Sequence, residues 1–275
     1  YLEWGRVTLT GNTISQNSGA GFYCQYVNKM TASGNTLSEN AANNNDQTAG
    51  FYLNHSQPGS VFENNLIANN RLGSRTVFVN TLNVSFKNNT LRDNQTDYDL
   101  YFNLGNANTL NFENNDWGTT DRTQILERIY DFFDDPDKGV VDFDPYLDAP
   151  SAGVPPLKST GLAVTAITKT SISLGWQANS ETDIVGYILY WKSEETQLQT
   201  VEMGNATSYT LSDLVPGRYT VWVAAKDSSG QVGPRSESVF QMLAGPIASL
   251  DILSDFTALK VGDSLNFSAA GTDTI

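Results

Sequence analysis

Residues 60–70 read Ser-Val-Phe-Glu-Asn-Asn-Leu-Ile-Ala-Asn-Asn, and variants of this phrase occur five times in the first 120 residues. Each copy has apolar residues at alternate positions, then a small residue or Asn, then an anchoring Asn. The anchors, at intervals of 23, 30, 24 and 26 residues, are Asn12, Asn35, Asn65, Asn89 and Asn115. A repeat this short cannot bury its own apolar face, so the copies must stack on one another. The pattern therefore predicts a β-solenoid.

A second short strand lies between successive anchors, as in Phe22-Tyr23-Cys24, so each turn of the solenoid should hold about three strands. A second Asn also recurs five places after the anchor, at Asn17, Asn40, Asn70 and Asn94. Asn tolerates the left-handed backbone of tight turns, and its amide can bond to the Asn one turn away, at roughly 4.8 Å. We therefore expect two ladders of Asn side chains, one at each of two corners.

These repeats resemble the right-handed parallel β-helix proteins, the superfamily of the pectate lyases and of repeats named for carbohydrate binding and sugar hydrolysis. The resemblance covers residues 1–148 and implies an extracellular polysaccharide or cell-surface glycan as the partner. After the last anchor, Asp121 is expected to cap a helix that carries Ile125, Ile129 and Phe133 on one face and stops at Pro136. Such a helix would cover the open end of the solenoid.

The second half of the chain has a different texture. Residues 149–158 are rich in Pro, Gly, Ser and Ala and are predicted to be a linker. Residues 159–244 resemble a fibronectin type III domain, with Leu214, Pro216, Gly217 and Tyr219 matching a tyrosine corner. Residues 245–275 resemble the start of a truncated bacterial immunoglobulin-like module. The predicted class is all-β: a parallel β-helix with a C-terminal capping helix, a β-sandwich and a partial sandwich.

Composition narrows the class of protein. The net charge is −14 and the pI is near 4.3, which disfavours nucleic acid as a partner. Cys24 is the only cysteine, and strand parity turns it inward. No signal peptide or membrane-spanning run is visible, and we interpret the chain as a fragment of a longer secreted or cell-surface protein. By its domain types it is expected to be extracellular and monomeric.

Strand parity yields one candidate binding surface. If Phe22 and Cys24 point inward, the residue between them points outward, and the same position in later turns is again aromatic. The resulting column is Tyr23, Tyr52, Phe78 and Tyr101. An exposed column of aromatic rings suits a glycan. The alternative is structural, since aromatic residues favour strands and stack on like neighbours in a parallel sheet.

Signs of catalysis are sparse. Asp97, Asp99 and Asp93 are the acids expected to point outward near the aromatic residues, with Arg75 and Arg92 as nearby bases. The paired Asp, Gly-His-Gly and Arg-x-Lys pattern of the galacturonases is absent, and no catalytic residue is assigned. His55, the sole histidine, is interpreted as a turn residue.

A calcium site is a weaker hypothesis. Four acids were expected to crowd the C-terminal end of the capping helix, where the helix dipole disfavours negative charge and a cation would relieve it: Asp131, Asp134, Asp135 and Asp137. Their spacing matches no EF-hand loop, so a solvated acidic turn is the competing interpretation. No other cofactor is expected.

Three functions remain open at this point. The chain could bind extracellular polysaccharide through its β-helix and so be displayed on that polysaccharide. It could belong to a polysaccharide lyase or glycoside hydrolase whose catalytic turns lie upstream of Tyr1. It could also be a structural stalk or adhesin at the cell surface, an interpretation that gains weight if the aromatic column is covered.

Overall fold

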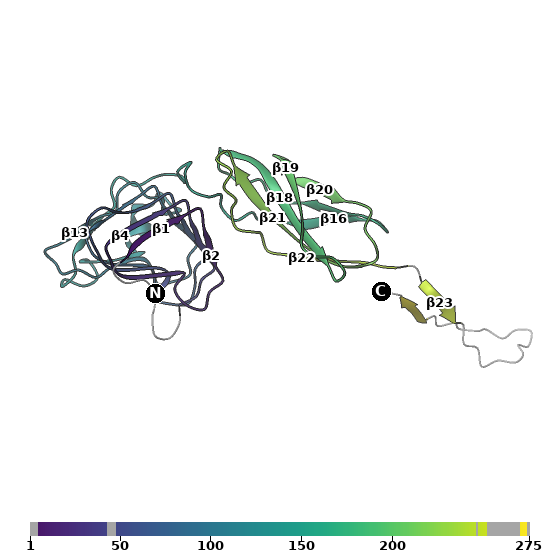
Figure 1. Cartoon of the computed structure of the whole chain (residues 1–275), viewed down its shortest axis with the longest axis horizontal. Helices are drawn as coiled ribbons and strands as arrows, with labels where there is room; N and C mark the ends of the chain where they lie inside the picture. The colour runs from purple at the N-terminus through teal and green to yellow at the C-terminus, as the bar shows by residue number, and fades with distance from the viewer. Residues whose placement is uncertain (1–4, 43–47, 246, 252–269, 274–275) are drawn as a thin grey trace, which may run out of the picture. The chain divides into compact units, whose positions relative to one another are not determined.

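A computed structural model describes residues 5–42, 48–245, 247–251 and 270–273. The chain divides into two compact units, a β-solenoid and a β-sandwich, and almost all of its regular structure is β-strand (Figure 1). The predicted all-β class and the predicted parallel β-helix are both confirmed.

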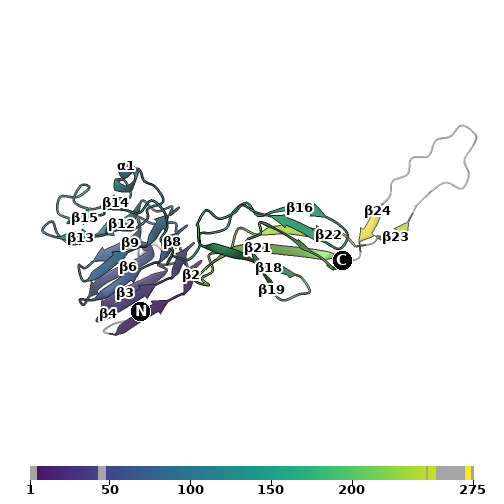
Figure 2. The same cartoon turned by 90° about the horizontal axis from the view of Figure 1, so that it is seen from above.

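Three parallel sheets run along the solenoid, and each takes one strand from every turn (Figure 2). The first sheet contains β1 (Arg6–Thr10), β4 (Lys29–Ser33), β7 (Ser60–Glu63) and β10 (Val84–Lys87). The second contains β2 (Thr13–Ser15), β5 (Thr36–Ser38), β8 (Leu66–Ala68) and β11 (Thr90–Arg92). The third contains β3 (Phe22–Val27), β6 (Thr48–Ser56), β9 (Arg75–Asn80), β12 (Tyr98–Phe102) and β14 (Ile129–Tyr130). Inward residues of all three sheets, Cys24 among them, form one continuous apolar core.

Both predicted Asn ladders are present. The backbone N–H and the Nδ2 of Asn65 donate to Oδ1 of Asn89 at 3.0 and 2.9 Å, and the same pair of bonds joins each anchor to the next from Asn12 to Asn115. The second ladder joins Asn17, Asn40, Asn70 and Asn94 in the same way. The residue before each anchor has a left-handed backbone, a conformation that Gly and Asn adopt more readily than other residues. This explains why every copy of the repeat has Gly or Asn at that position, namely Gly11, Gly34, Asn64, Asn88 and Asn114.

The predicted capping helix is much shorter than expected. Asp121 caps it as predicted, accepting from the N–H of Thr123 at 2.9 Å, but α1 spans only Arg122–Leu126. Ile129 and Tyr130 form β14 instead, because they pair with β12 and add a further strand to the third sheet. The apolar spacing that suggested a helix face therefore reflects one helical turn followed by a strand, and Phe133 is 75% exposed rather than packed on the core.

Two strands close this end of the solenoid. β13 (Thr109–Asn111) pairs in parallel with β15 (Val140–Asp142). Beyond them the linker returns to the solenoid, where buried Val154 packs against Leu66 and Ala68.

The sandwich has the two sheets expected of its type. One contains β16 (Ala163–Ile167), β17 (Ile172–Gly175) and β20 (Ser208–Leu211). The other contains β19 (Gln199–Gly204), β18 (Ile184–Ser193), β21 (Gly217–Asp227) and β22 (Val239–Leu243). The hydroxyl of Tyr219 donates to the carbonyl of Val215 at 2.8 Å, which confirms the predicted tyrosine corner.

After the sandwich, β23 (Ile247–Asp251) and β24 (Ala270–Asp273) form an antiparallel pair. Most of the immunoglobulin-like module predicted at residues 245–275 lies outside the described residues.

Candidate functional site: the outward face of the third sheet

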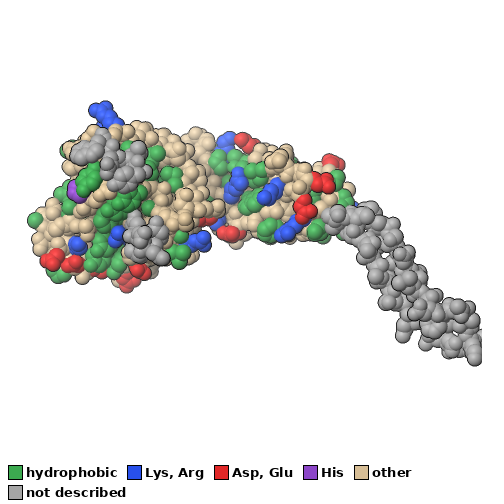
Figure 3. Space-filling model, turned by 60° about the horizontal axis from the view of Figure 1, so that its bottom comes forward, with side chains coloured by type: hydrophobic (Ala, Val, Ile, Leu, Met, Phe, Trp, Pro, Cys, Tyr) green, Lys and Arg blue, Asp and Glu red, His purple; other side chains and the backbone are tan. Residues whose placement is uncertain are grey.

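Five aromatic rings stack in register along the outward face of the third sheet, and we call them the aromatic column: Tyr23, Tyr52, Phe78, Tyr101 and Tyr130. Successive ring centroids are 4.1, 4.6, 5.8 and 4.2 Å apart, with interplanar angles of 6°, 9°, 26° and 6°. The four rings predicted from strand parity therefore lie together. Figure 3 shows this hydrophobic band on the solenoid.

The rings are packed face against face, so the column presents ring edges and tyrosine hydroxyls to solvent. The tyrosines are half-buried, but Phe78 is only 6% exposed. The guanidinium of Arg75 lies 4.5 Å from the centroid of Phe78 and 5.1 Å from that of Tyr101. The expectation that Phe78 is exposed is therefore wrong, because its neighbours and Arg75 cover it.

Tyr130 was missed as a member of the column because it was assigned to a helix. Its ring lies parallel to that of Tyr101 at 4.2 Å, while Tyr98 meets it edge to face at 5.2 Å. Burial and the neighbouring Tyr101 hydroxyl raise the pKa of Tyr130 to about 12. The signal in the sequence was the pair Ile129-Tyr130, which repeats the apolar-aromatic order of Leu100-Tyr101.

A second column of polar side chains, missed at the sequence level, lies two residues further along each strand. This amide column contains Gln25, Asn54, Asn80 and Asn103. Asn80 donates to Asn54 at 2.7 Å, and the amide of Asn54 donates to the Tyr52 hydroxyl at 3.4 Å. Aromatic edges and amides thus lie side by side across several turns of the sheet.

Beyond the amide column the surface is hollowed into a groove of about 530 Å³. Tyr26 and His55 line it with rings stacked at 5.0 Å, and Leu82 adds an exposed apolar side chain. Both Tyr26 and His55 have left-handed backbones, with φ of 53° and 55°, near the ends of β3 and β6. His55, predicted to lie in a turn, therefore lies within β6, one residue before its end.

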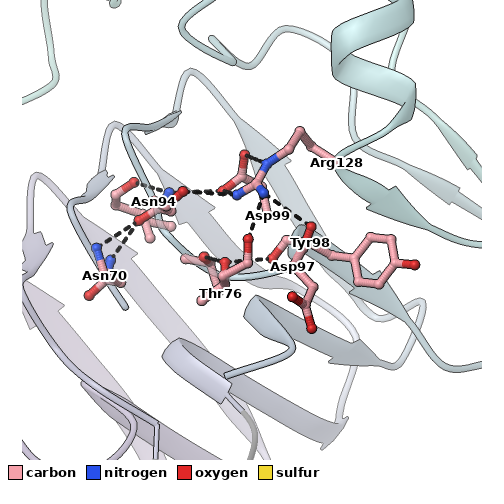
Figure 4. Close-up of polar contacts among 9 residues, drawn as sticks. Asn70, Thr76, Asn94, Asp97, Tyr98, Asp99 and Arg128 are labelled. Atoms are coloured by element: carbon pink, nitrogen blue, oxygen red, sulfur yellow. Dashed lines mark hydrogen bonds and ion pairs between the residues drawn. The ribbon is translucent and has the colours of Figure 1, made fainter. Parts of the chain in front are cut away.

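Asp99, expected to point outward, is instead 5% exposed and ion-paired (Figure 4). Arg128 donates to both carboxylate oxygens of Asp99 at 3.1 Å. Its remaining donors reach the backbone carbonyls of Asn94, Thr96 and Asp97 at 2.6 to 3.1 Å. All five guanidinium N–H groups are thus occupied. Burial raises the pKa of Asp99, and Arg128 partly offsets this. Asp99 is therefore half of a structural ion pair and not the exposed acid that was predicted.

The four calcium candidates do not lie at a helix end, because α1 stops at Leu126. Asp131 is 3% exposed, and its carboxylate accepts from the backbone N–H groups of Val141 at 2.9 Å and Phe133 at 3.0 Å. Asp134 and Asp135 each accept a backbone N–H as well. Across residues 5–42 and 48–245, no cluster of three or more His, Cys, Asp or Glu side chains is arranged to hold a metal. Calcium binding stays a prediction.

Comparison with known proteins agrees with the two units. Residues 2–117 match the family described as "Right handed beta helix region", and residues 155–242 match "Fibronectin type III domain". A chicken (Gallus gallus) receptor-type tyrosine-protein phosphatase S is 37% identical over 79 residues, which are 28% of this chain and 5% of that protein. The chain therefore spans about a twentieth of the length of this curated relative.

Solved structures are similar to about a third of the chain. The FN1-FN3 domains of chicken CNTN1 share 26% identity, with 32% of this chain and 31% of that chain covered and a TM-score of 0.30. The FN5 domain of Drosophila Lar shares 21% identity, with 33% of this chain and 99% of that chain covered and a TM-score of 0.29.

Fold and family matches together define a modular protein of the extracellular type. Its modules are a right-handed β-helix of about five turns and a fibronectin type III domain. Within the described residues, no helix is both long and apolar enough to cross a membrane.

Proposed function

We propose that this chain is part of a secreted or cell-surface protein whose β-helix binds a neutral extracellular polysaccharide along the outward face of the third sheet. The observation that supports this most is the aromatic column with the amide column beside it. A neutral glycan fits better than an anionic one, because the net charge of −14 would repel a polyanion.

The mode of binding follows from the packing of the rings. Ring faces stack on one another, so a sugar would meet ring edges, tyrosine hydroxyls and the carboxamides of Gln25 and Asn54. A carboxamide carries both donors and an acceptor, which match the hydroxyl groups of a sugar, and a bound sugar would share these groups with the neighbouring Tyr and Asn side chains. Recognition would therefore rest on hydrogen bonds spread over several turns.

The test is a glycan array probed with the full chain and with two variants. Tyr23→Ser combined with Gln25→Ala alters the face while leaving buried Phe78 in place. Phe240→Ser, which removes a 58% exposed ring from the sandwich, is the matched control. We expect a neutral glycan to bind the wild type and the control, and to bind the solenoid variant at least about tenfold more weakly. Absence of binding to every neutral glycan would refute the proposal, whether or not an acidic glycan binds.

A structural stalk or adhesin is the second candidate. It is favoured by the covered Phe78 and by ring faces that stack on one another, since both serve the stability of the solenoid. A failed array, together with a large loss of stability in Tyr52→Ser, would favour this role.

A further inference from the structure

A cavity of about 670 Å³ lies at the C-terminal cap of the solenoid, and we call it the cap cavity. It is partly open to solvent, and its walls come from α1, β13, β15 and the loop after β14. Its apolar lining comes from Leu126, Phe133, Val140, Val141 and Phe143. Phe133 is 75% exposed, and the adjacent Phe132 is 40% exposed and meets it edge to face at 5.7 Å. Large aromatic side chains left uncovered beside an apolar cavity mark an interaction surface.

The charged side chains around this cavity are mostly negative. Its lining includes five acids and one base, the acids being Glu127, Asp131, Asp134, Asp142 and Asp144. The base, Arg122, is already paired with Asp144 at 2.9 Å and lies 5.0 Å from the ring centroid of Phe143. Glu127, Asp134 and Asp142 make no ion pair within the described part of the chain. An apolar floor with an unneutralised acidic rim is complementary to a cationic, amphipathic ligand.

The backbone at this site is not open to strand addition. The N–H of Val141 does not face β13, and the carboxylate of Asp131 accepts it at 2.9 Å. A partner that extends the sheet through β15 would have to displace this buried carboxylate. Binding would therefore use side chains that enter the cavity.

We propose that the cap cavity binds a cationic amphipathic peptide segment of another protein. An aliphatic or aromatic side chain of the segment fills the space beside Phe133 and Phe143. Flanking lysine or arginine side chains pair with Glu127, Asp134 and Asp142. This site is separate from the outward face of the third sheet, so it does not depend on glycan binding.

The test uses the full chain and a fluorescent peptide of alternating lysine and leucine, with a glutamate and leucine peptide as reference. We expect the lysine peptide alone to bind, and Phe133→Ser to weaken it about tenfold. The exposure of Phe133 makes this variant safe for the fold. The double change Glu127→Gln and Asp134→Asn should weaken binding about fivefold. Neutralising two exposed acids of the sandwich, Glu194→Gln and Glu195→Gln, should leave it unchanged.

Three results would overturn the proposal. Equal weakening by both double variants would mean that the peptide is attracted only by the overall negative charge. Unchanged binding to Phe133→Ser would exclude the cavity. Concentration-dependent dimerisation of the full chain in sedimentation experiments, abolished by Phe133→Ser, would make a second copy the occupant.

Discussion

The side-chain amide of Asn94 donates to Oδ1 of Asp99 at 3.0 Å, so a carboxylate ends a ladder that is otherwise built from asparagines. Arg128 holds the same oxygen at 3.1 Å and fixes the loop that carries Asn94 (Figure 4). One ion pair, between the buried Asp99 and the half-buried Arg128, therefore links the end of the second Asn ladder to the cap.

Replacing Asp99 should destabilise the solenoid strongly. Asp99→Ala removes the acceptor for Asn94 and leaves Arg128 without its carboxylate, and we expect a loss of about 2–4 kcal/mol in the free energy of unfolding. Asp99→Asn keeps one acceptor and should lose less. Urea denaturation of the full chain measures both. Asp97→Asn is the control, because Asp97 is exposed and Arg128 binds its backbone carbonyl rather than its carboxylate.

The middle of the first Asn ladder should be more sensitive than its start. Asn65 is fully buried, and its Oδ1 accepts both the N–H and the Nδ2 of Asn35. Asn65→Ala leaves these donors unpaired in the core, so we expect a loss of about 3 kcal/mol or more. Asn12→Ala, at an exposed position, should lose less than about 1 kcal/mol. Similar losses in both variants by denaturant titration would contradict this account.

Alkaline pH should weaken the solenoid through Tyr130. Its pKa is about 12 in the folded chain, against about 10 for an unperturbed tyrosine, so ionisation favours the unfolded state. The stabilisation is complete below about pH 10 and is lost as the pH rises towards 12. Unfolding free energies measured from pH 9 to 12 should fall more steeply for the wild type than for Tyr130→Phe. Tyr209→Phe, on the sandwich, should behave like the wild type.

Cys24 should be inert while the solenoid is folded. It is 0% exposed, and burial raises the pKa of its thiol to about 11, so the reactive thiolate is scarce at neutral pH. We expect a thiol reagent such as DTNB to label it only after denaturant opens the solenoid. Asn65→Ala should accelerate labelling under native conditions, and rapid labelling of the native wild type would contradict the inward orientation of Cys24.

Much of the fold could be predicted because the spacing of the repeat depends on how the turns of the solenoid stack. Each Asn anchor needs a left-handed residue before it and an equivalent Asn one turn away, so the sequence spacing reports directly on the three-dimensional register. Strand parity likewise located the aromatic column. The amide column could have been predicted from the same strand parity, because its residues lie two places after each ring and therefore on the same face.

The cap was harder to predict, since the regular repeat stops there. Ile125 and Ile129 have the spacing of a helix face, yet Ile129 pairs with Leu100 as a strand of the third sheet and is 2% exposed there. Asp99 was misplaced for a related reason. The last acceptor of the second Asn ladder is not a residue at the equivalent position of the next turn but Asp99, which belongs to the following strand, β12.

The second Asn ladder has a direction. From Asn17 to Asn94, every side-chain Nδ2 points to the oxygen of the next turn, so the amide dipoles add head to tail and their positive end faces Asp99. Hydrogen bonds in such a chain polarise one another. The row of amides at this corner thus forms an aligned dipole with an anion at its positive end. A carboxylate at the start of a helix is placed in the same way. Loss of one amide should therefore weaken the hydrogen bonds on either side of it in the ladder.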